Sequence, residues 1–592
     1  MSGRCAALAI CSRGIYSCYW KHSSERKRRC ACCWFSFVGL ATLLTLAWLF
    51  IWMALYNSRD DMNTKTFEKM KEWINWFMVI VIISAVLAIY CLLLLLFALF
   101  QYALNEPLDL HCVHKVFLSV GLLIVLAGVV AISREWKNEW PTVPVFLQAT
   151  APFLQLGAVL ALTLLSGLVF KTYYRARRSA SRVFIMLAWA VVSLVVFLCP
   201  LLIHDFSPCV LEELPPKPAL VGHRGAPMLA PENTMMSFRR SLECNVTAFE
   251  TDVLLSKDGH PFLMHDNASL RRTTDVEKIF PQRKDNSSNS FTRNEIRRLN
   301  AGQGFLDLQT DPLQRTPSLS DTEWSNVRNQ SVPFLQDLLD LAKEHNVSII
   351  FDLKNERLNN SDANYTVQTI LASGIAQNLI WWLPRVHRAD VKKMAPGFRQ
   401  VYGSLPALRN DNGSHLNVKY NKLSTKEMRE LRNKNVSVNL WVVNQRWLFS
   451  LVWCSGASSV TTNACHIFKD MAQPDWTLEP KLYMMIWISA DLVSLLMMFG
   501  LFLLQRCCLR HAKGRCLATI INQISLELKN KKIRSFSCQL KFNIHNIIKC
   551  NLIFQSFMKA LFHFSLLILL IIDVDHLLNM YINKLKCILL VS

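Results

Sequence analysis

The chain has 592 residues, of which 52% are hydrophobic, and its formal net charge is +22 at pH 7. The long uninterrupted apolar runs exclude an ordinary soluble protein, while the length leaves room for several domains. The positive charge does not indicate a nucleic-acid partner, because 19 of the 22 charges lie in three blocks beside apolar runs: residues 1–33, 171–182 and 506–545.

Apolar runs are the most regular feature of the chain. They cover roughly 34–56, 77–100, 116–132, 145–170, 183–203 and 482–504. Most reach the roughly 18–20 residues that are needed to cross the hydrocarbon core of a bilayer, and the third run is the shortest. We therefore expect five transmembrane helices within residues 34–203 and a sixth at 482–504.

The basic segments predict an orientation, because Lys and Arg are enriched in cytoplasmic loops. If residues 1–33 are cytoplasmic, the loops 101–115 and 171–182 also face the cytoplasm. Residues 204–481 then lie outside, and residues 505–592 form a cytoplasmic tail. This predicts a multi-pass protein of the plasma membrane or another secretory-pathway membrane, with both termini cytoplasmic.

Potential N-glycosylation sites support the same orientation. Asn-X-Ser/Thr sequons occur at Asn245, Asn267, Asn286, Asn329, Asn346, Asn359, Asn364, Asn412 and Asn435. All of them lie within 204–481, which predicts an extracellular or lumenal glycosylated domain there.

Four cysteines lie in this outer region: Cys209, Cys244, Cys454 and Cys465. In an oxidising compartment they could form two disulfides, and buried free thiols are an equal alternative. The sequence leaves the pairing open.

The tail after Gly514 contains no Gly and no Pro. Its apolar segment at 552–574 could form a seventh span or an interfacial helix, and an alternative or intron-derived C-terminus would also explain the composition. We assign no function to it.

Short β-rich runs alternate with helical stretches between the fifth and sixth apolar runs. The runs are Ala219–His223, Ala248–Val253, Pro261–His265, Ser348–Leu353, Leu379–Leu383, Val401–Leu405, Val438–Val443 and Ser458–Thr462. Eight strands with intervening helices predict an α/β fold, a (β/α)8 or TIM barrel inserted into an all-α transmembrane region. The long gap after the third run indicates an insertion.

Polar residues gather at the ends of the first four predicted strands. They are His223 and Arg224 on the first strand, Glu250 and Asp252 on the second, His265 on the third, and Asp352 and Lys354 on the fourth. In a barrel the carboxyl ends of the strands converge on one face, where active sites lie. We expect these side chains to meet there.

The carboxylates among these residues predict a metal site. Glu250, Asp252 and Asp352 offer hard oxygen ligands, which suit Mg²⁺ or Ca²⁺ better than zinc. The metal, Arg224 and Lys354 would neutralise the charge that builds on a phosphate in the transition state. This combination indicates phosphodiester cleavage.

The two histidines are candidates for proton transfer. His223 and His265 could act as general base and general acid, because imidazole titrates near neutral pH. Each residue alone is more often structural or solvated. Their placement at successive strand ends favours the functional interpretation.

Several motifs resemble those of the glycerophosphodiester phosphodiesterase family. They are Val221–Gly225, Pro231–Thr234, Phe249–Val253, Asp258-Gly259, His265-Asp266, Trp441–Asn444 and Thr461–Asn463. The resemblance covers roughly residues 218–470. Together with the surrounding spans, it makes the chain similar to the six-span animal subfamily.

The resemblance implies a TIM barrel, a divalent cation and catalytic roles for His223, Arg224 and His265. It places the metal on Glu250, Asp252 and Asp352. Most soluble members have Glu where this chain has Asp352, so the shorter side chain leaves His265 as an alternative third ligand. Residues implied in substrate binding are Arg224, Glu232, Asn233, Lys354 and Trp441.

The implied substrates are glycerophosphoinositol, glycerophosphocholine or similar lipid-derived diesters, including glycosylphosphatidylinositol anchors in a membrane. Two alternatives remain: another barrel phospholipase of the C or D type, and an inactive surface binding module. Nothing in the sequence indicates an oligomeric state.

Overall fold

The computed structural model describes residues 14–18, 31–70, 74–104, 108–202, 207–309, 320–354 and 361–528. The chain divides into two units, Met1–Phe502 and Leu503–Ser592. The apolar segment 552–574, the sequon at Asn359 and most of the basic segment 1–33 lie outside the described residues.

Among the residues that the structure describes, six helices are long and apolar enough to cross a membrane. They are α2 (Ala31–Leu55), α4 (Trp76–Leu104), α5 (Cys112–Glu135), α6 (Thr142–Arg175), α7 (Ser179–Leu202) and α20 (Pro480–Leu528). They carry large exposed apolar side chains, such as Leu164 (68% exposed) and Phe184 (73% exposed). Such a surface suits lipid rather than water, and all six predicted runs, including the third, are helical.

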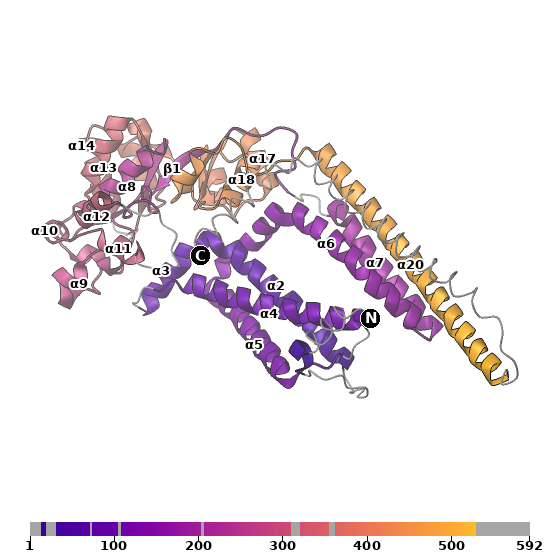
Figure 1. Cartoon of the computed structure of the whole chain (residues 1–592). Helices are drawn as coiled ribbons and strands as arrows, with labels where there is room; N and C mark the ends of the chain where they lie inside the picture. Colours follow the sequence, from indigo (N-terminus) through magenta and orange to yellow (C-terminus); the bar gives the residue numbers. More distant parts are fainter. Residues whose placement is uncertain are drawn as a thin grey trace. The chain divides into compact units, whose positions relative to one another are not determined.

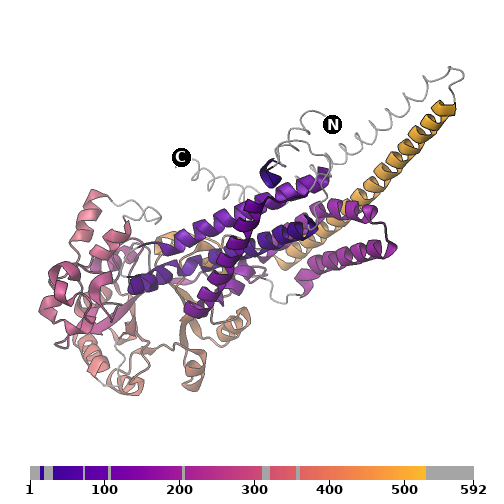
Figure 2. The same ribbon diagram turned by 90° about the horizontal axis from the view of Figure 1, so that it is seen from below.

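The apolar helices pack in two groups, which contact each other through α2 and α6. In one, α2 lies against α4 and α5 (Figure 1, Figure 2). In the other, α6 lies against α7, and α20 joins both: Thr163 and Ser494 share a hydrogen bond of 2.7 Å, and Trp487 Nε1 donates to Phe197 O at 2.9 Å. Buried polar bonds of this kind join helices where lipid offers no competing partner.

The sheet between α7 and α20 contains eight parallel strands. They are β1 (Ala219–His223), β2 (Ala248–Leu255), β4 (Ser348–Leu353), β5 (Ile380–Trp382), β6 (Arg399–Gln400), β7 (His415–Lys419), β8 (Ser437–Trp441) and β9 (Ser459–Thr462). Their order is β6-β5-β4-β2-β1-β9-β8-β7, and a parallel bridge between Tyr402 and Leu416 nearly closes the ring. The predicted (β/α)8 barrel is confirmed.

Three strand predictions were wrong in detail. The run 261–265 is not a barrel strand, because β3 (Pro261–Leu263) pairs antiparallel with β2 through a tight turn at Gly259. Parallel neighbours need a crossover of a dozen residues, which this short connection cannot provide. The barrel strand β7 was missed, and β6 lies just before the predicted run 401–405.

Helices follow the barrel strands in the expected alternation. They are α8 (Met235–Leu242), α13 (Leu335–His345), α14 (Ser361–Ala372), α15 (Arg388–Met394), α16 (Leu405–Asn410), α17 (Thr425–Asn433), α18 (Arg446–Cys454) and α19 (Cys465–Phe468). Of these, α8, α13 and α14 pack in sequence (Figure 1). Apolar strand faces and helix faces, including Phe249, Phe351 and Trp382, form one buried core.

The predicted insertion has a small core of its own. Its helices are α9 (Val276–Ile279), α10 (Arg293–Ile296), α11 (Gln303–Gln309) and α12 (Asp321–Arg328). Phe262, Leu270 and Phe291 are fully buried in this core. The insertion is therefore a packed substructure beside the barrel.

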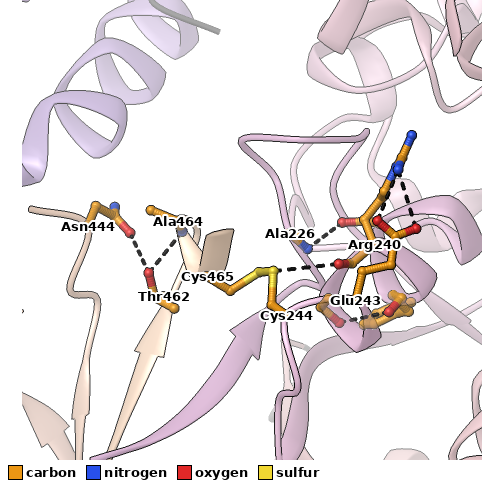
Figure 3. Close-up of a disulfide and its surroundings, with 11 residues drawn as sticks. Ala226, Arg240, Glu243, Cys244, Asn444, Thr462, Ala464 and Cys465 are labelled. Carbon is orange, nitrogen blue, oxygen red and sulfur yellow. Dashed lines mark hydrogen bonds and ion pairs between the residues drawn. A yellow bond between two sulfur atoms is a disulfide. The ribbon is translucent and has the colours of Figure 1, made fainter. Parts of the chain in front are cut away.

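Two disulfides join distant parts of the segment between α7 and α20, Cys209–Cys454 and Cys244–Cys465. Figure 3 shows the second, which links the chain just after α8 to the start of α19. Nearby, the Ala464 N–H donates to Thr462 Oγ1 at 2.8 Å. The pairing that the sequence left open therefore ties the first β/α unit to the last.

Candidate active site

Three carboxylates meet at the carboxyl ends of β2 and β4. Glu250 and Asp252 share one side of β2 because side chains alternate along a strand. Asp252 is in register with Asp352 on β4. One oxygen from each of the three residues lies within 4.8 Å of the other two.

Two cations contact this carboxylate cluster. Lys354 Nζ lies 2.6 Å from Asp352 Oδ2 and 2.9 Å from Asp252 Oδ1. Arg224 Nε lies 3.0 Å from Asp252 Oδ2. Burial alone would raise the pKa of Asp252, but Arg224 and Lys354 hold it well below the usual range.

Glu250 is in the opposite situation. Burial and the neighbouring charge of Asp252 raise the pKa of Glu250 well above its usual value. A divalent cation among the three carboxylates would favour the ionised form. The three carboxylates offer hard oxygen ligands, and a positive charge between them would offset their mutual repulsion. The cluster therefore fits Mg²⁺ or Ca²⁺.

His223 lies at the end of β1, beside the carboxylates. Its Nδ1 is 2.5 Å from Asn463 Oδ1, and its Nε2 is 3.8 Å from Glu250 Oε2. Burial and the charge of Arg224 lower the pKa of His223 to about 3, so the imidazole is neutral at physiological pH. With Nδ1 donating to Asn463, Nε2 carries the lone pair that a base needs.

His265 is held by a different partner. Its Nδ1 lies 2.8 Å from Asp266 Oδ1, which also accepts from Arg272 Nη2 at 3.1 Å. The described residues that gather as potential metal ligands are the three carboxylates. The geometry thus brings together the ligand set that contains Asp352.

Arg272 is one of the residues that the sequence reasoning missed. It comes from the insertion and bonds Glu232, whose Oε2 accepts from Arg272 Nη1 at 2.9 Å. Arg224 Nη1 donates to the other oxygen of Glu232 at 3.1 Å. Burial would raise the pKa of Glu232, but Arg272 and Arg224 lower it to about 2. No sequence signal separated this arginine from its neighbours.

Two of the residues implied in substrate binding have other surroundings. The side chain of Asn233 is buried, donates to Asp252 Oδ2 at 2.9 Å and accepts from Thr251 Oγ1 at 3.1 Å. Both of its polar ends are occupied within the barrel, and its bond to Asp252 orients that carboxylate. Trp441 is 37% exposed at the end of β8 and lines a small side pocket.

A cavity of about 110 Å³ opens beside these groups. Its walls include His223, Arg224, Glu232, Arg272 and Asn463. Arginines, a neutral histidine and adjacent carboxylates around one cavity can bind a phosphodiester and transfer a proton. Fold and site together define a barrel hydrolase of phosphate esters.

Comparison with known proteins gives the family. Residues 223–375 match the model of the "Glycerophosphoryl diester phosphodiesterase family". The chain is 41% identical to mouse "Glycerophosphoinositol inositolphosphodiesterase GDPD2" over 533 residues, which cover 88% of this chain and 98% of that protein. It is 40% identical to mouse "Glycerophosphodiester phosphodiesterase domain-containing protein 5" over 512 residues, covering 84% and 83% of the two chains.

The chain therefore belongs to the glycerophosphodiester phosphodiesterase family, whose members are phosphoric diester hydrolases. A solved phosphodiesterase from Oleispira antarctica, in complex with the product sn-glycerol-3-phosphate, is 18% identical. That likeness covers 43% of this chain and 95% of the bacterial one, with a TM-score of 0.35.

Proposed function

We propose that the barrel hydrolyses glycerophosphodiesters with the help of Mg²⁺ or Ca²⁺ bound by Glu250, Asp252 and Asp352. One observation carries this proposal: three carboxylate oxygens lie within 4.8 Å of one another beside Arg224 and His223. When bound, the cation would neutralise charge on the phosphate.

Glycerophosphoinositol is the substrate that we favour. The GDPD2 relative is named for action on this diester, and the match spans 98% of that relative. Glycerophosphocholine and glycosylphosphatidylinositol anchors are the competitors to be compared with it.

The side chains suggest how the reaction proceeds. The neighbouring 2-hydroxyl of the glycerol attacks phosphorus while His223 Nε2 takes its proton, and His265 protonates the leaving alkoxide. The resulting cyclic phosphate is then opened by water. Proximity favours the first step, because nucleophile and phosphorus belong to one molecule.

We also propose that the barrel is extracytoplasmic. The sequon asparagines at 245, 286, 329, 346, 364, 412 and 435 are exposed, and Asn267 is half-buried. Glycans need such access. The two disulfides agree with an oxidising compartment.

The test is turnover of a small panel of glycerophosphodiesters by the purified full-length chain. We expect release of an alcohol and a phosphomonoester from glycerophosphoinositol, loss of activity in EDTA, and recovery with Mg²⁺ or Ca²⁺. The Asp252→Asn variant should be nearly inactive yet folded. Full turnover in chelator would remove the metal from the mechanism, and no turnover of any diester would overturn the proposed function.

A further inference from the structure

The helix α3 (Arg59–Met70) connects the first two apolar helices and is polar. It follows α2 through the short turn Tyr56–Ser58. Asp60 and Asp61 lie in its first turn and Lys69 in its last, the charge order that suits a helix dipole. This helix is therefore a structured part of the loop between α2 and α4.

Residues of α3 line the same cavity as the catalytic candidates. They are Arg59, Asp60, Asp61, Asn63 and Thr64. His223 and Arg224 belong to the same lining. One wall of the site thus comes from the transmembrane part of the chain.

Specific bonds hold this wall against the barrel strands. Asn57 Nδ2 donates to Val442 O at 2.8 Å, and Asn57 Oδ1 accepts from Asn444 N at 2.8 Å. Asn57 is buried, and the Val442 and Asn444 groups directly follow β8. The amide N–H and the carbonyl oxygen of the Asn57 side chain therefore both bond the barrel, and they join the turn after α2 to it.

A buried ion pair adds a second attachment. Lys419 at the end of β7 lies 2.6 Å from Glu139, which precedes α6, and Glu139 also accepts from Ser58 Oγ at 2.8 Å. Tyr420 OH lies 3.3 Å from Ser58 Oγ and 3.2 Å from Thr142 Oγ1. Breaking a buried pair of this kind is costly, so the start of α3 is held firmly.

Asp61 differs from the other carboxylates of the cavity. Asp60 pairs with Arg59 at 3.0 Å, and Glu232 pairs with two arginines. Asp61 is exposed and lines both the main cavity and the side pocket near Trp441. Among the described residues it has no hydrogen bond or ion-pair partner, so its carboxylate is available to a ligand.

The chemistry of this wall indicates which part of a substrate it meets. A phosphate belongs next to Arg224 and Arg272, whose guanidinium groups line the cavity. Thr64 offers a donor and an acceptor for hydroxyl groups, whereas the side chain of Asn63 is occupied, because it donates to Asn75 Oδ1 and accepts from the Phe77 N–H. Among the described residues, Phe305 and the imidazole of His223 are the aromatic groups of the main cavity lining, and the side pocket adds Tyr420 and Trp441. Quaternary ammonium groups favour aromatic surroundings, so choline is the competing head group that the experiment has to exclude.

We propose that α3 completes the substrate site and that Asp61 accepts hydrogen bonds from the hydroxyls of a polyhydroxylated head group. This inference rests on the proposed function and adds the residue that selects the alcohol. In this proposal the barrel carries the groups that cleave the phosphodiester. The loop between the first two apolar helices carries the group that distinguishes one head-group alcohol from another.

The experiment compares specificity constants of the full-length chain in detergent or nanodiscs. Glycerophosphoinositol is measured against glycerophosphocholine and glycerophosphoethanolamine for the wild type, Asp61→Ala and Glu68→Gln. Glu68 is an exposed carboxylate on the same helix outside the cavity lining, which makes it the matched control. We expect Asp61→Ala to lower the ratio of kcat/KM for the polyol over the amines roughly 10-fold, mainly through KM. Glu68→Gln should leave this ratio unchanged.

Other outcomes would overturn the inference. If Asp61→Ala leaves the ratio of kcat/KM for the polyol over the amines unchanged, Asp61 does not determine which head group is preferred. This holds whether all substrates are affected equally or none is affected. A raised ratio, with loss confined to the amine substrates, would make Asp61 the partner of a cation instead. A wild type that turns over no diester would overturn the proposed function and this inference with it.

Discussion

At the scale of single residues, the site depends on how each side chain is held. His223 donates to Asn463, and His265 bonds Asp266, so the two imidazoles have distinct supports. Arg272 contacts Glu232 and Asp266. It thereby connects the insertion to the motif residues of the barrel.

The histidine pair gives a sharp residue-scale prediction. His223→Ala and His265→Ala should each lower kcat roughly 10²–10⁴-fold, which is the usual contribution of general acid–base catalysis. The double variant should lose much less than the product of the two losses, because groups that act together are not additive. Steady-state kinetics on glycerophosphoinositol measures this.

A cation titration supplies the control for this pair. If His265 is a proton donor, raising Mg²⁺ or Ca²⁺ will not rescue His265→Ala. Rescue of that variant, but not of His223→Ala, would instead make His265 a metal ligand. Near-native activity of both variants would mean that the chemistry lies elsewhere.

The pairing of Glu232 predicts a pH dependence of stability. Its pKa is lowered from the usual 4.5 to about 2, so the ionised form stabilises the fold above pH 4.5. That contribution is lost as the pH falls from 4.5 through about 2. The melting temperatures of wild type and Glu232→Gln should therefore differ most at pH 7 and converge at low pH. A difference that stays constant down to pH 3 would contradict this assignment.

At the scale of elements, a disulfide joins the chain just after the first helix of the barrel to the last helix. Cys244 follows α8, Cys465 begins α19, and both side chains are buried. The bridge closes a loop with a sequence separation of 221 residues, which restricts the unfolded chain strongly.

Removing this bridge should destabilise the folded domain. We expect Cys244→Ala with Cys465→Ala to lower the free energy of unfolding by roughly 2–5 kcal/mol. The loss of stability is measured by thermal unfolding with and without reductant. Reductant should lower the melting temperature of the variant less than that of the wild type. Cys112→Ala is the control, since that exposed cysteine is free. An unchanged melting temperature in the double variant would rule out a stabilising bridge.

At the scale of the whole molecule, membrane helices and catalytic domain belong to one chain. The polar helix α3 lies between two apolar helices and lines the candidate active site. A cut between the membrane part and the barrel would therefore remove a wall of the cavity.

The proposed orientation makes a prediction for the intact protein in cells. Peptide-N-glycosidase should increase its electrophoretic mobility, because the exposed sequons would carry glycans. Tags at the two termini should bind antibody only after the membrane is permeabilised. An N-terminal tag that is accessible on intact cells would contradict the orientation.

The sequence by itself determined the features that depend on local composition. A run of about 20 apolar residues predicts a membrane helix wherever it occurs, which is why all six were found. The residues at the ends of β1, β2 and β4 were also found, because strand alternation places Glu250 and Asp252 on one side. The general barrel fold followed from the recurring strands and helices.

Only the tertiary structure decided the features that join distant segments. The run after Asp258 became a hairpin arm, while β7 completed the ring, because strand pairing is chosen by the whole sheet. The disulfide partners, the support of Asp252 by Asn233 and the position of Arg272 likewise depend on long-range packing. Asp61 is the clearest case: in the sequence it is one acid in a polar loop, and folding brings it to the cavity of His223, since tertiary contacts set which residues share a site.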